Sequence, residues 1–442
     1  MGCDVSERGA RSKTQLVADR RELHRLAEPG WCEVFTASKV VKVLQESGWQ
    51  VRCGADVISR DARMGLPPQR TLDFFLNRAL DHGADPVTAE KLRDGFTGVV
   101  GTLNGGAAGP VIAFRFDLDA NNGGEATSRD HRPVREGFSS IHEGFHHNCG
   151  HDGHTSMGLG LARTLARIRH ELAGEIRLIF QPAEEGLRGA KAMVAAGVLD
   201  GVDYFVGCHL GVQALSVGEV ITGYKDILGS IKLDVNFTGK SAHAAISPHD
   251  GRNAVLAACV AAQNLMAIPR HGDGDTRVNV GRISGGDSRN TVPSSADLSI
   301  ELRADNADTL QFLRDTAARV VAGAALMHEV TSRSDLVGES RAASSDPELA
   351  KIVHEAAREV PQVKAIRDCV EFRGSDDAAE MMRAVQGRGG KAVYFGIGTE
   401  LSAIHHNPRF DFNEDALPIG LEILERLTCL LGAPGSGARP RN

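Results

Sequence analysis

Residues 146–154, with the sequence HHNCGHDGH, are the feature that most constrains this chain. They place four histidines, one cysteine and one aspartate within nine residues. Imidazole and thiolate are preferred ligands of zinc and related metals, and the two glycines let the backbone turn so that neighbouring side chains converge. A polar turn with surface histidines is the alternative. The density of ligand types, with Cys149 and His151 two residues apart, favours a metal site.

Candidate ligands also follow apolar segments elsewhere in the chain. Residues 155–168 carry apolar side chains at helical spacing, so the cluster lies on a loop that enters a helix. Three predicted strands each end at metal-ligand residue types: Asp117 and Asp119 after 111–116, Glu184 and Glu185 after 175–181, and His209 after 202–208. In open α/β sheets, ligands bind beyond the carboxyl ends of the strands. These residues therefore predict one shared site, although turn capping and an acidic first helical turn are alternative roles for the carboxylates.

Length, charge and cysteine content exclude several classes of protein. The 442 residues suffice for two domains, and the net charge of −7 gives no reason to expect nucleic acid binding. The glycines form neither G-x-G-x-x-G nor a P-loop, which argues against nucleotide binding. The 8 cysteines include no C-x-x-C pair and fit a reducing, cytoplasmic location. No apolar run reaches the roughly 20 residues that a membrane span needs, and no signal-peptide core is present.

The order of predicted elements indicates a discontinuous two-domain chain. From residue 225 the pattern is β-α-β-β-α-β, the order of a ferredoxin-like unit, and the earlier pattern resumes after 335. We predict an α/β fold in which a mixed-sheet metallopeptidase domain carries this unit as an inserted lid or dimerisation domain. The predicted boundaries are 14–224 and 336–432 for the catalytic domain, 225–335 for the lid, and 1–13 and 433–442 for disordered tails. Residues 54–95 form a polar insertion whose role the sequence does not reveal.

Motifs along nearly the whole chain resemble the metal-dependent aminoacylase/carboxypeptidase family, which includes the plant auxin–amino acid conjugate hydrolases. They are CGHDGH at 149–154, QPAEEG at 181–186, the strand ending at His209, SAHA at 241–244 and HNPRF at 406–410. Further segments are similar to the branch of p-aminobenzoyl-glutamate hydrolase A subunits: RMGLP at 63–67, GFTG at 95–98, HRP at 131–133 and the pair Arg289–Asn290. The 54–95 insertion belongs to that similarity.

The resemblance implies two divalent metal ions, manganese or zinc. The implied ligands are Cys149, His151, Glu185, His209 and His406. Glu184 matches the general base, and Asp119 matches a carboxylate that supports a metal ligand. In the inserted domain, His243, Asn290 and Arg303 match residues that contact the substrate or the oxyanion, with His243 often reaching across a dimer.

Two positions stay open at this point. Other branches of the family have a histidine ligand where this chain has Asp117, and an aspartate where it has Cys149, so the role of Asp117 is undecided. His405 precedes His406 and competes with it as a ligand, but the following Asn-Pro-x-Phe frame favours His406.

The implied reaction is hydrolysis of the amide bond of an N-acyl or N-aroyl amino acid. Metal ions would activate a water, Glu184 would transfer its proton, and Arg303 with Asn290 would hold a substrate carboxylate. His243 would help to stabilise the oxyanion. The expected substrate is p-aminobenzoyl-glutamate, and the expected partner is a second copy or a homologous B subunit. The alternatives are a broad-specificity N-acyl-amino-acid amidohydrolase or dipeptidase, and a non-catalytic subunit.

Overall fold

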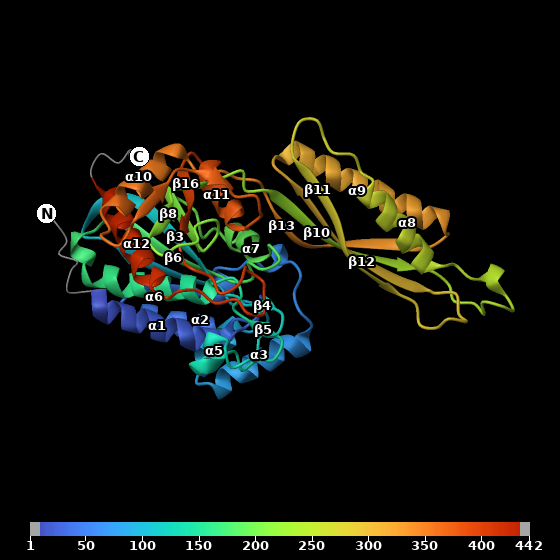
Figure 1. The fold of residues 1–442 in the computed structure, drawn as a ribbon, viewed down its shortest axis with the longest axis horizontal. Coiled ribbons are helices and arrows are strands. Elements are labelled where there is room, and N and C mark those ends of the chain that lie inside the picture. The colour runs from blue at the N-terminus through green and yellow to red at the C-terminus, as the bar shows by residue number, and fades with distance from the viewer. Residues whose placement is uncertain (1–8, 434–442) are drawn as a thin grey trace.

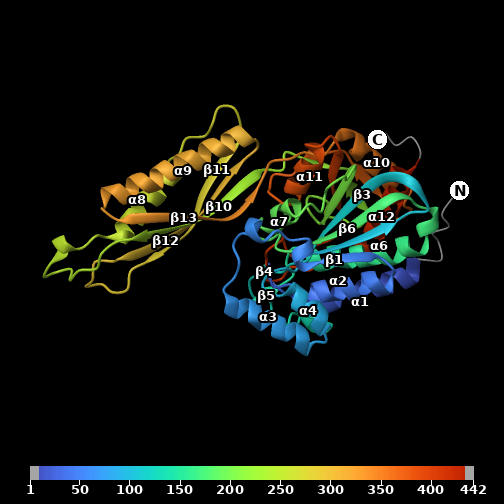
Figure 2. The same ribbon diagram turned by 180° about the vertical axis from the view of Figure 1, so that it is seen from behind.

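The protein is described by a computed structural model that covers residues 9–433. Two units lie side by side, and the chain passes between them twice (Figures 1 and 2). The larger unit holds both ends of the described chain and an eight-stranded sheet, whereas residues 229–340 form the smaller unit around a four-stranded sheet. Within the described range, no helix is long and apolar enough to cross a membrane.

The larger unit is a mixed sheet with helices on both faces. Its sheet has the order β1-β2-β6-β3-β7-β16-β8-β14, with a parallel centre from β6 to β16. The pairs β1-β2, β2-β6 and β16-β8 are antiparallel, and the edge pair β8-β14 is parallel. The strands are β1 (Gln50–Cys53), β2 (Val99–Asn104), β3 (Ala107–Asp117), β6 (Ala173–Gln181), β7 (Tyr204–Leu210), β8 (Glu219–Ile221), β14 (Ala365–Arg367) and β16 (Lys391–Ile397). Two small ribbons pair β4 (Asn121–Asn122) with β5 (Phe145–His146), and β9 (Tyr224–Lys225) with β15 (Val370–Glu371).

The helices of the larger unit divide between the two faces of the sheet. They are α1 (Gly9–Arg25), α2 (Val34–Glu46), α3 (Gln69–Asp81), α4 (Pro86–Leu92), α5 (Arg132–Arg135), α6 (His151–Arg167), α7 (Gly189–Ala195), α10 (Pro347–Arg358), α11 (Ala378–Gln386) and α12 (Ala416–Gly432). Because successive strand residues point to opposite faces, Ile112 and Phe114 of β3 join the core under α6 and α12. Val111 and Ala113 join the core under α7 and α11.

Helix α6 packs directly on the sheet, and this contact fixes the position of its first turn. A Cβ atom at Gly158 would lie 2.7 Å from the rings of both Phe116 and Phe180. Such a distance is shorter than real contacts, so only glycine lets the helix approach this closely. The N-terminus of α6, at His151, therefore lies at a fixed height beside the ends of β3 and β6.

The smaller unit has the ferredoxin-like arrangement that the sequence predicted. Its elements are β10 (Gly229–Thr238), α8 (Ala254–Met266), β11 (Thr276–Gly285), β12 (Ser295–Ala304), α9 (Ala307–Met327) and β13 (Thr331–Ser340). The antiparallel sheet has the order β11-β12-β10-β13. One face of this sheet packs on α8 and α9 through a separate apolar core, which includes Phe237, Leu298 and Leu313.

The sequence misplaced several element boundaries. Helix α1 begins at Gly9, before the predicted domain start at residue 14, and the predicted disorder of residues 1–8 and 434–442 lies outside the described residues. Strand β13 runs from Thr331 to Ser340, beyond residue 335, where the sequence predicted the lid to end. Its first half is exposed and polar, so hydrophobic alternation gave no signal for its length. Helix α4 within the 54–95 insertion was missed.

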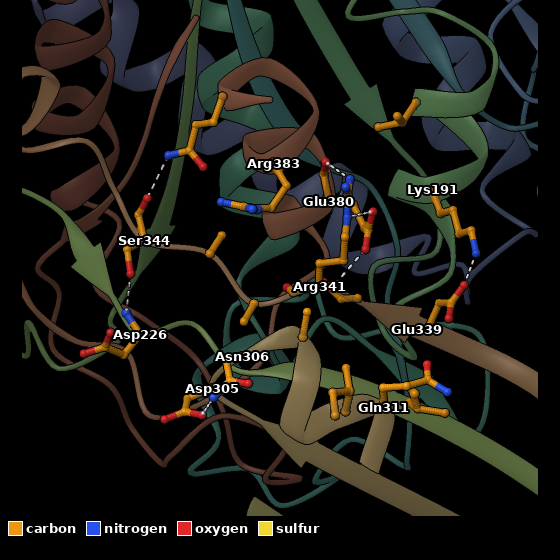
Figure 3. A pocket seen from close by; sticks show the side chains of 18 of the residues that line it. Lys191, Asp226, Asp305, Asn306, Gln311, Glu339, Arg341, Ser344, Glu380 and Arg383 are labelled. Carbon is orange, nitrogen blue, oxygen red and sulfur yellow. Dashed lines mark hydrogen bonds and ion pairs between the residues drawn. The ribbon is translucent and has the colours of Figure 1, made fainter. Parts of the chain in front are cut away.

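A crevice of about 970 Å³ separates the two units on the side of α7, α9 and α11. Figure 3 shows that charged side chains span this crevice. Lys191 of α7 pairs with Glu339 of β13, and the Arg341 Nε donates to a Glu380 carboxylate oxygen of α11 at 2.8 Å. These ion pairs hold the end of β13 against the larger unit.

Candidate metal centre

The predicted metal ligands converge at one edge of the large sheet, although they come from four distant segments. Two of them lie at the start of α6, one follows β6, one lies in β7, and one lies in the loop after β16. In that order, they are Cys149 and His151, Glu185, His209, and His406. The carboxyl ends of parallel strands meet here, as the sequence argument required.

The turn between Cys149 and His151 lets both side chains face the same space. Gly150 has a φ of +87°, a left-handed conformation that glycine adopts without steric cost. Cys149, Glu185 and their neighbours line a cavity of about 250 Å³. The tight turn therefore places the Cys149 thiol on the wall of this cavity and the His151 imidazole close to that thiol.

The ligand atoms form two overlapping groups. Cys149, His151 and His209 form one group, and Cys149, Glu185 and His406 form the other; within each, the ligand atoms lie within 4.8 Å of one another. The Cys149 Sγ lies 3.5 Å from the His209 Nε2, and a Glu185 oxygen lies 3.3 Å from the His406 Nε2. Because Cys149 belongs to both groups, the donor set suits two neighbouring cations.

The hydrogen bonds of these residues leave their inward atoms available for a metal. The His151 Nδ1 donates to the Asp119 carbonyl at 2.8 Å, and the His209 Nδ1 donates to the Leu210 carbonyl at 2.9 Å. In the neutral imidazole each bond places the proton on Nδ1 and leaves Nε2 as an acceptor, which is the usual arrangement of a metal-binding histidine. The His151 Nε2 and the Glu185 Oε1 are buried without a hydrogen-bond partner. The residues therefore fit a metal centre.

The structure distinguishes His405 from His406. The His405 Nε2 donates to the Leu210 carbonyl at 3.1 Å, and burial lowers the pKa of its imidazole to about 4. The His406 Nε2 instead points to Glu185. His406 has a φ of +65°, a conformation that side-chain-bearing residues adopt at a cost and that occurs often at functional sites.

Asp119 positions the two adjacent glutamates. One Asp119 oxygen accepts from the Glu184 amide at 3.0 Å, and the other accepts from the Glu185 amide at 2.9 Å. Ala183, just before them, has a φ of +52°. This strained turn and the two amide bonds direct the neighbouring side chains to different parts of the cavity.

Glu184 is buried among other carboxylates beside the candidate ligands. Burial raises the pKa of its carboxyl well above the ordinary range, and the carboxylates of Asp376 and Asp377 raise it further. A Glu184 oxygen lies 3.9 Å from the His151 Nε2, so the base lies beside the candidate ligands. Asp376 and Asp377 were not predicted as site residues, although two adjacent carboxylates repeat the pairing of Glu184 and Glu185.

Asp117 is bound to protein side chains around the cluster. Its oxygens accept from the Arg115 guanidinium at 2.7 Å and from the His154 Nδ1 at 2.6 Å. The His154 Nε2 accepts from the Leu210 amide at 3.0 Å, so both of its ring nitrogens are engaged. Burial opposes ionisation of Asp117, but the charges of His151, His154 and Arg115 lower its pKa well below the usual value. These contacts support a positioning role for Asp117.

Of the three predicted site residues in the smaller unit, Arg303 lies near the cluster, whereas His243 and Asn290 lie away from it. Arg303 of β12 lines the 250 Å³ cavity together with Lys232 of β10, a residue that the sequence argument missed. His243 and Asn290 do not approach the cluster of their own chain. They lie on exposed segments joined by a bridge between His243 and Thr291, and the segment between β10 and α8 lies at the outer end of the smaller unit in Figure 1.

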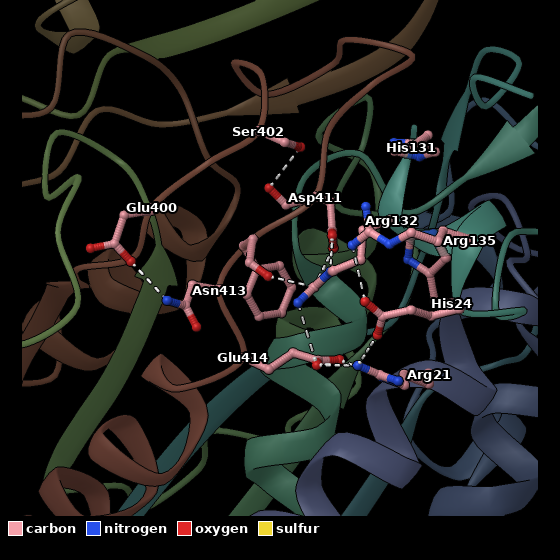
Figure 4. A network of polar contacts seen from close by, with 12 residues as sticks. Arg21, His24, His131, Arg132, Arg135, Glu400, Ser402, Asp411, Asn413 and Glu414 are labelled. Carbon is pink, nitrogen blue, oxygen red and sulfur yellow. Dashed lines mark hydrogen bonds and ion pairs between the residues drawn. The ribbon is translucent and has the colours of Figure 1, made fainter. Parts of the chain in front are cut away.

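A buried polar network supports the start of α6 from behind. The Arg20 guanidinium of α1 donates to Asp152 at 2.8 Å, to Asp411 at 2.7 Å and to Glu414 at 3.1 Å. Figure 4 shows how Asp411 and Glu414 gather further arginines of the network. A buried charge is costly unless it is paired, so these contacts fix Asp152, the neighbour of His151, in one position.

Glu125 extends this network through two histidines. One of its oxygens lies 3.0 Å from both the His24 Nε2 and the His131 Nε2, and the other accepts from the Ser140 amide at 2.6 Å. The His24 Nδ1 contacts Asp152 at 2.8 Å. Burial would raise the pKa of Glu125, but the hydrogen bond and charge of His24, with the other bonds, lower it to about 2.

Replacing Glu125 should reduce stability in a pH-dependent way. Its folded pKa lies below the unfolded value of 4.5, so the ionised carboxylate stabilises the fold above that pH, and the contribution disappears as the pH falls towards 2. We expect Glu125→Gln to lower the free energy of unfolding by about 2–3 kcal/mol at pH 7, and urea titrations at several pH values measure the difference. The exposed Glu90→Gln is the control. An equal loss at pH 7 and at pH 3 would contradict the charge argument.

Comparisons with known proteins agree with this geometry. A model of peptidase family M20/M25/M40 matches residues 113–429. An indole-3-acetyl-aspartic acid hydrolase of Enterobacter agglomerans is 45% identical over 406 residues, covering 92% of this chain and 93% of that protein. The A subunit of p-aminobenzoyl-glutamate hydrolase from Escherichia coli (strain K12) is 44% identical, with coverage of 92% and 93%. The crystal structure of an aminobenzoyl-glutamate utilization protein from Klebsiella pneumoniae has a TM-score of 0.84 and 40% identity, with coverage of 97% and 98%.

Proposed function

Because this chain belongs to peptidase family M20/M25/M40, we propose that it hydrolyses the amide bond of an N-acyl or N-aroyl amino acid at the cluster around Cys149. One observation carries the proposal. The His151 Nε2 and the Glu185 Oε1 are buried without a hydrogen-bond partner, the Glu185 Oε1 faces the His406 Nε2 at 3.3 Å, and the carboxylate of Glu184 lies beside them. A closed structural metal site has no use for such a free base, whereas a catalytic site needs one to receive a proton.

The proposed ligands of two divalent cations, manganese or zinc, are Cys149, His151, Glu185, His209 and His406. Such ions polarise an amide carbonyl and lower the pKa of a bound water towards about 7. Glu184 accepts the proton of the attacking water and delivers it to the leaving amine nitrogen. Asp119 keeps Glu184 and Glu185 apart through its two amide bonds, so that each performs a separate task.

The proposed substrate is an aromatic acyl group joined to an acidic amino acid. The two relatives with 45% and 44% identity are named for indole-3-acetyl-aspartic acid and p-aminobenzoyl-glutamate. Both names combine an aromatic acyl group with a dicarboxylic amino acid, and p-aminobenzoyl-glutamate is our first choice. Arg303 lines the cavity and is placed to bind a substrate carboxylate by charge-assisted hydrogen bonds.

We propose that the active form contains two chains, the second being either another copy or a homologous B subunit. His243 and Asn290 are exposed and distant from the cluster of their own chain, so they can act only on the site of a neighbouring chain. There, His243 would donate to the oxyanion of the tetrahedral intermediate. A reducing, cytoplasmic location completes the proposal, and it is supported by the free state of the described cysteines, Cys32 to Cys429.

Release of p-aminobenzoate from p-aminobenzoyl-glutamate by the purified chain tests this function. The assay is run on metal-free protein and after addition of manganese or zinc, with indole-3-acetyl-aspartate as the second substrate. Metal-dependent release supports the site and the substrate class. Equal rates on unrelated N-acetyl amino acids and dipeptides would replace the proposal with a broad-specificity amidohydrolase. Failure to bind metal would refute the assigned ligands.

A further inference from the structure

Lys232 of β10 lies where two cavities meet beside the metal ligands. The 250 Å³ cavity contains Arg303, and a neighbouring groove of about 440 Å³ contains Pro67 and Thr71 of the 54–95 insertion. Glu185, Gly186, Lys232 and His406 line both spaces. An amide placed at the cluster would therefore have its two halves in different cavities, with Lys232 beside both.

Lys232 and Arg303 form a cationic pair on one face of the smaller sheet. In the register of β10 and β12, Lys232 lies opposite Glu301, and Arg303 is two residues farther along the same face. Arg303 donates to Glu301 through two nitrogens at 3.0 Å, whereas the Lys232 Nζ lies 3.7 Å from the same carboxylate. Two cations thus share one anion, and Lys232 is the less tightly engaged of the two.

Arg188, the other basic side chain that lines the 440 Å³ groove, is hydrogen-bonded to backbone carbonyls. The Arg188 Nη1 donates to the Gly65 carbonyl at 2.7 Å, and its Nη2 donates to the Glu185 carbonyl at 2.8 Å. Arg188 thereby ties the insertion to the loop of the metal ligands. Its geometry gives Arg188 a structural role. Lys232, whose Nζ lies 3.7 Å from Glu301, is therefore the cation that can meet a second anionic group of the substrate.

We propose that Lys232 binds the side-chain carboxylate of an acidic amino acid and so selects N-acyl glutamate and aspartate over neutral conjugates. The inference rests on the proposed function. Arg303 takes one carboxylate of the dicarboxylic amino acid, and Lys232 takes the other. Before the substrate binds, the Glu301 carboxylate lies between the two cations and offsets the repulsion of their charges. A neutral side chain at the same place would leave the charge of Lys232 without its substrate partner.

The test compares p-aminobenzoyl-glutamate with p-aminobenzoyl-glutamine, which has the same length and no side-chain charge. We expect Lys232→Met to lower kcat/KM for the glutamate conjugate by about 10- to 100-fold, mainly through KM, because a hydrogen bond to a charged group is lost. The glutamine conjugate should be affected by no more than about twofold. Lys232→Arg should keep the preference, since it keeps the charge. The exposed Lys351→Met on α10 is the matched control.

Binding measurements keep the inference testable if turnover needs a second chain. Calorimetry on metal-loaded Glu184→Gln protein, with and without Lys232→Met, gives the affinity for both conjugates directly. An equal loss on both conjugates, or no loss on either, would overturn the role of Lys232. A wild-type chain that neither hydrolyses nor binds any acyl amino acid would refute the proposed function itself, which is a different result.

Discussion

Glu184→Gln should reduce kcat for amide hydrolysis by about 10²- to 10⁴-fold, which is the usual contribution of a positioned general base. Glutamine fills the same volume but cannot accept the proton of the attacking water. The amide of residue 184 still donates to Asp119, so the turn that presents the neighbouring ligand should be kept. Metal content, measured on the purified protein, should therefore remain that of the wild type.

Glu185→Gln is the matched variant one residue away. Its buried Oε1 has no hydrogen-bond partner and faces the His406 Nε2 at 3.3 Å. We expect this variant to lose metal together with activity, whereas Glu184→Gln loses only activity. Retention of most turnover by Glu184→Gln would sink the assignment of the base, and loss of metal from it would show that Glu184 is itself a ligand.

Much of the fold and of the ligand set could be predicted because their signals are local. The apolar strand before Asp117 and the helical spacing after His154 are readable from neighbouring residues alone. The family resemblance, now confirmed by the match over 113–429, placed these elements in one fold. The assignment of individual site residues remains a prediction, and the geometry around His151 and Glu185 supports it.

The residues that were missed depend on tertiary contacts. Lys232 is one of the polar residues on an alternating strand, and nothing in its neighbours indicates that it faces a cavity of the other unit. Asp376 precedes α11 by two residues, and its sequence is equally typical of a helix start. Asp376 matters because its carboxylate lies close to that of Glu184, a residue almost two hundred positions earlier in the chain. Such pairs become visible only when the sheet brings the strand ends together.

Cys149→Ala should abolish both metal binding and hydrolysis. Cys149 is the one residue shared by the two groups of ligand atoms, so its removal weakens both cation positions at once. Loss of a residue that only orients a ligand costs about 10–100-fold in metal affinity. Loss of a shared ligand should cost at least the upper figure. Metal analysis after dialysis and the p-aminobenzoate assay measure the two effects.

Cys149→Asp provides the sharper comparison, because the family resemblance implies an aspartate at this position in other branches. A carboxylate can still bridge the two groups, so we expect this variant to regain metal and activity relative to Cys149→Ala. Carboxylates favour harder cations than thiolates do, so the metal preference of this variant should move towards manganese relative to the wild type. Cys259→Ser on α8, outside the cluster, should behave as the wild type. If Cys149→Ala kept its metal, the thiol would only line the cavity without binding a cation. The cations would then have to be held by the histidines and Glu185 alone.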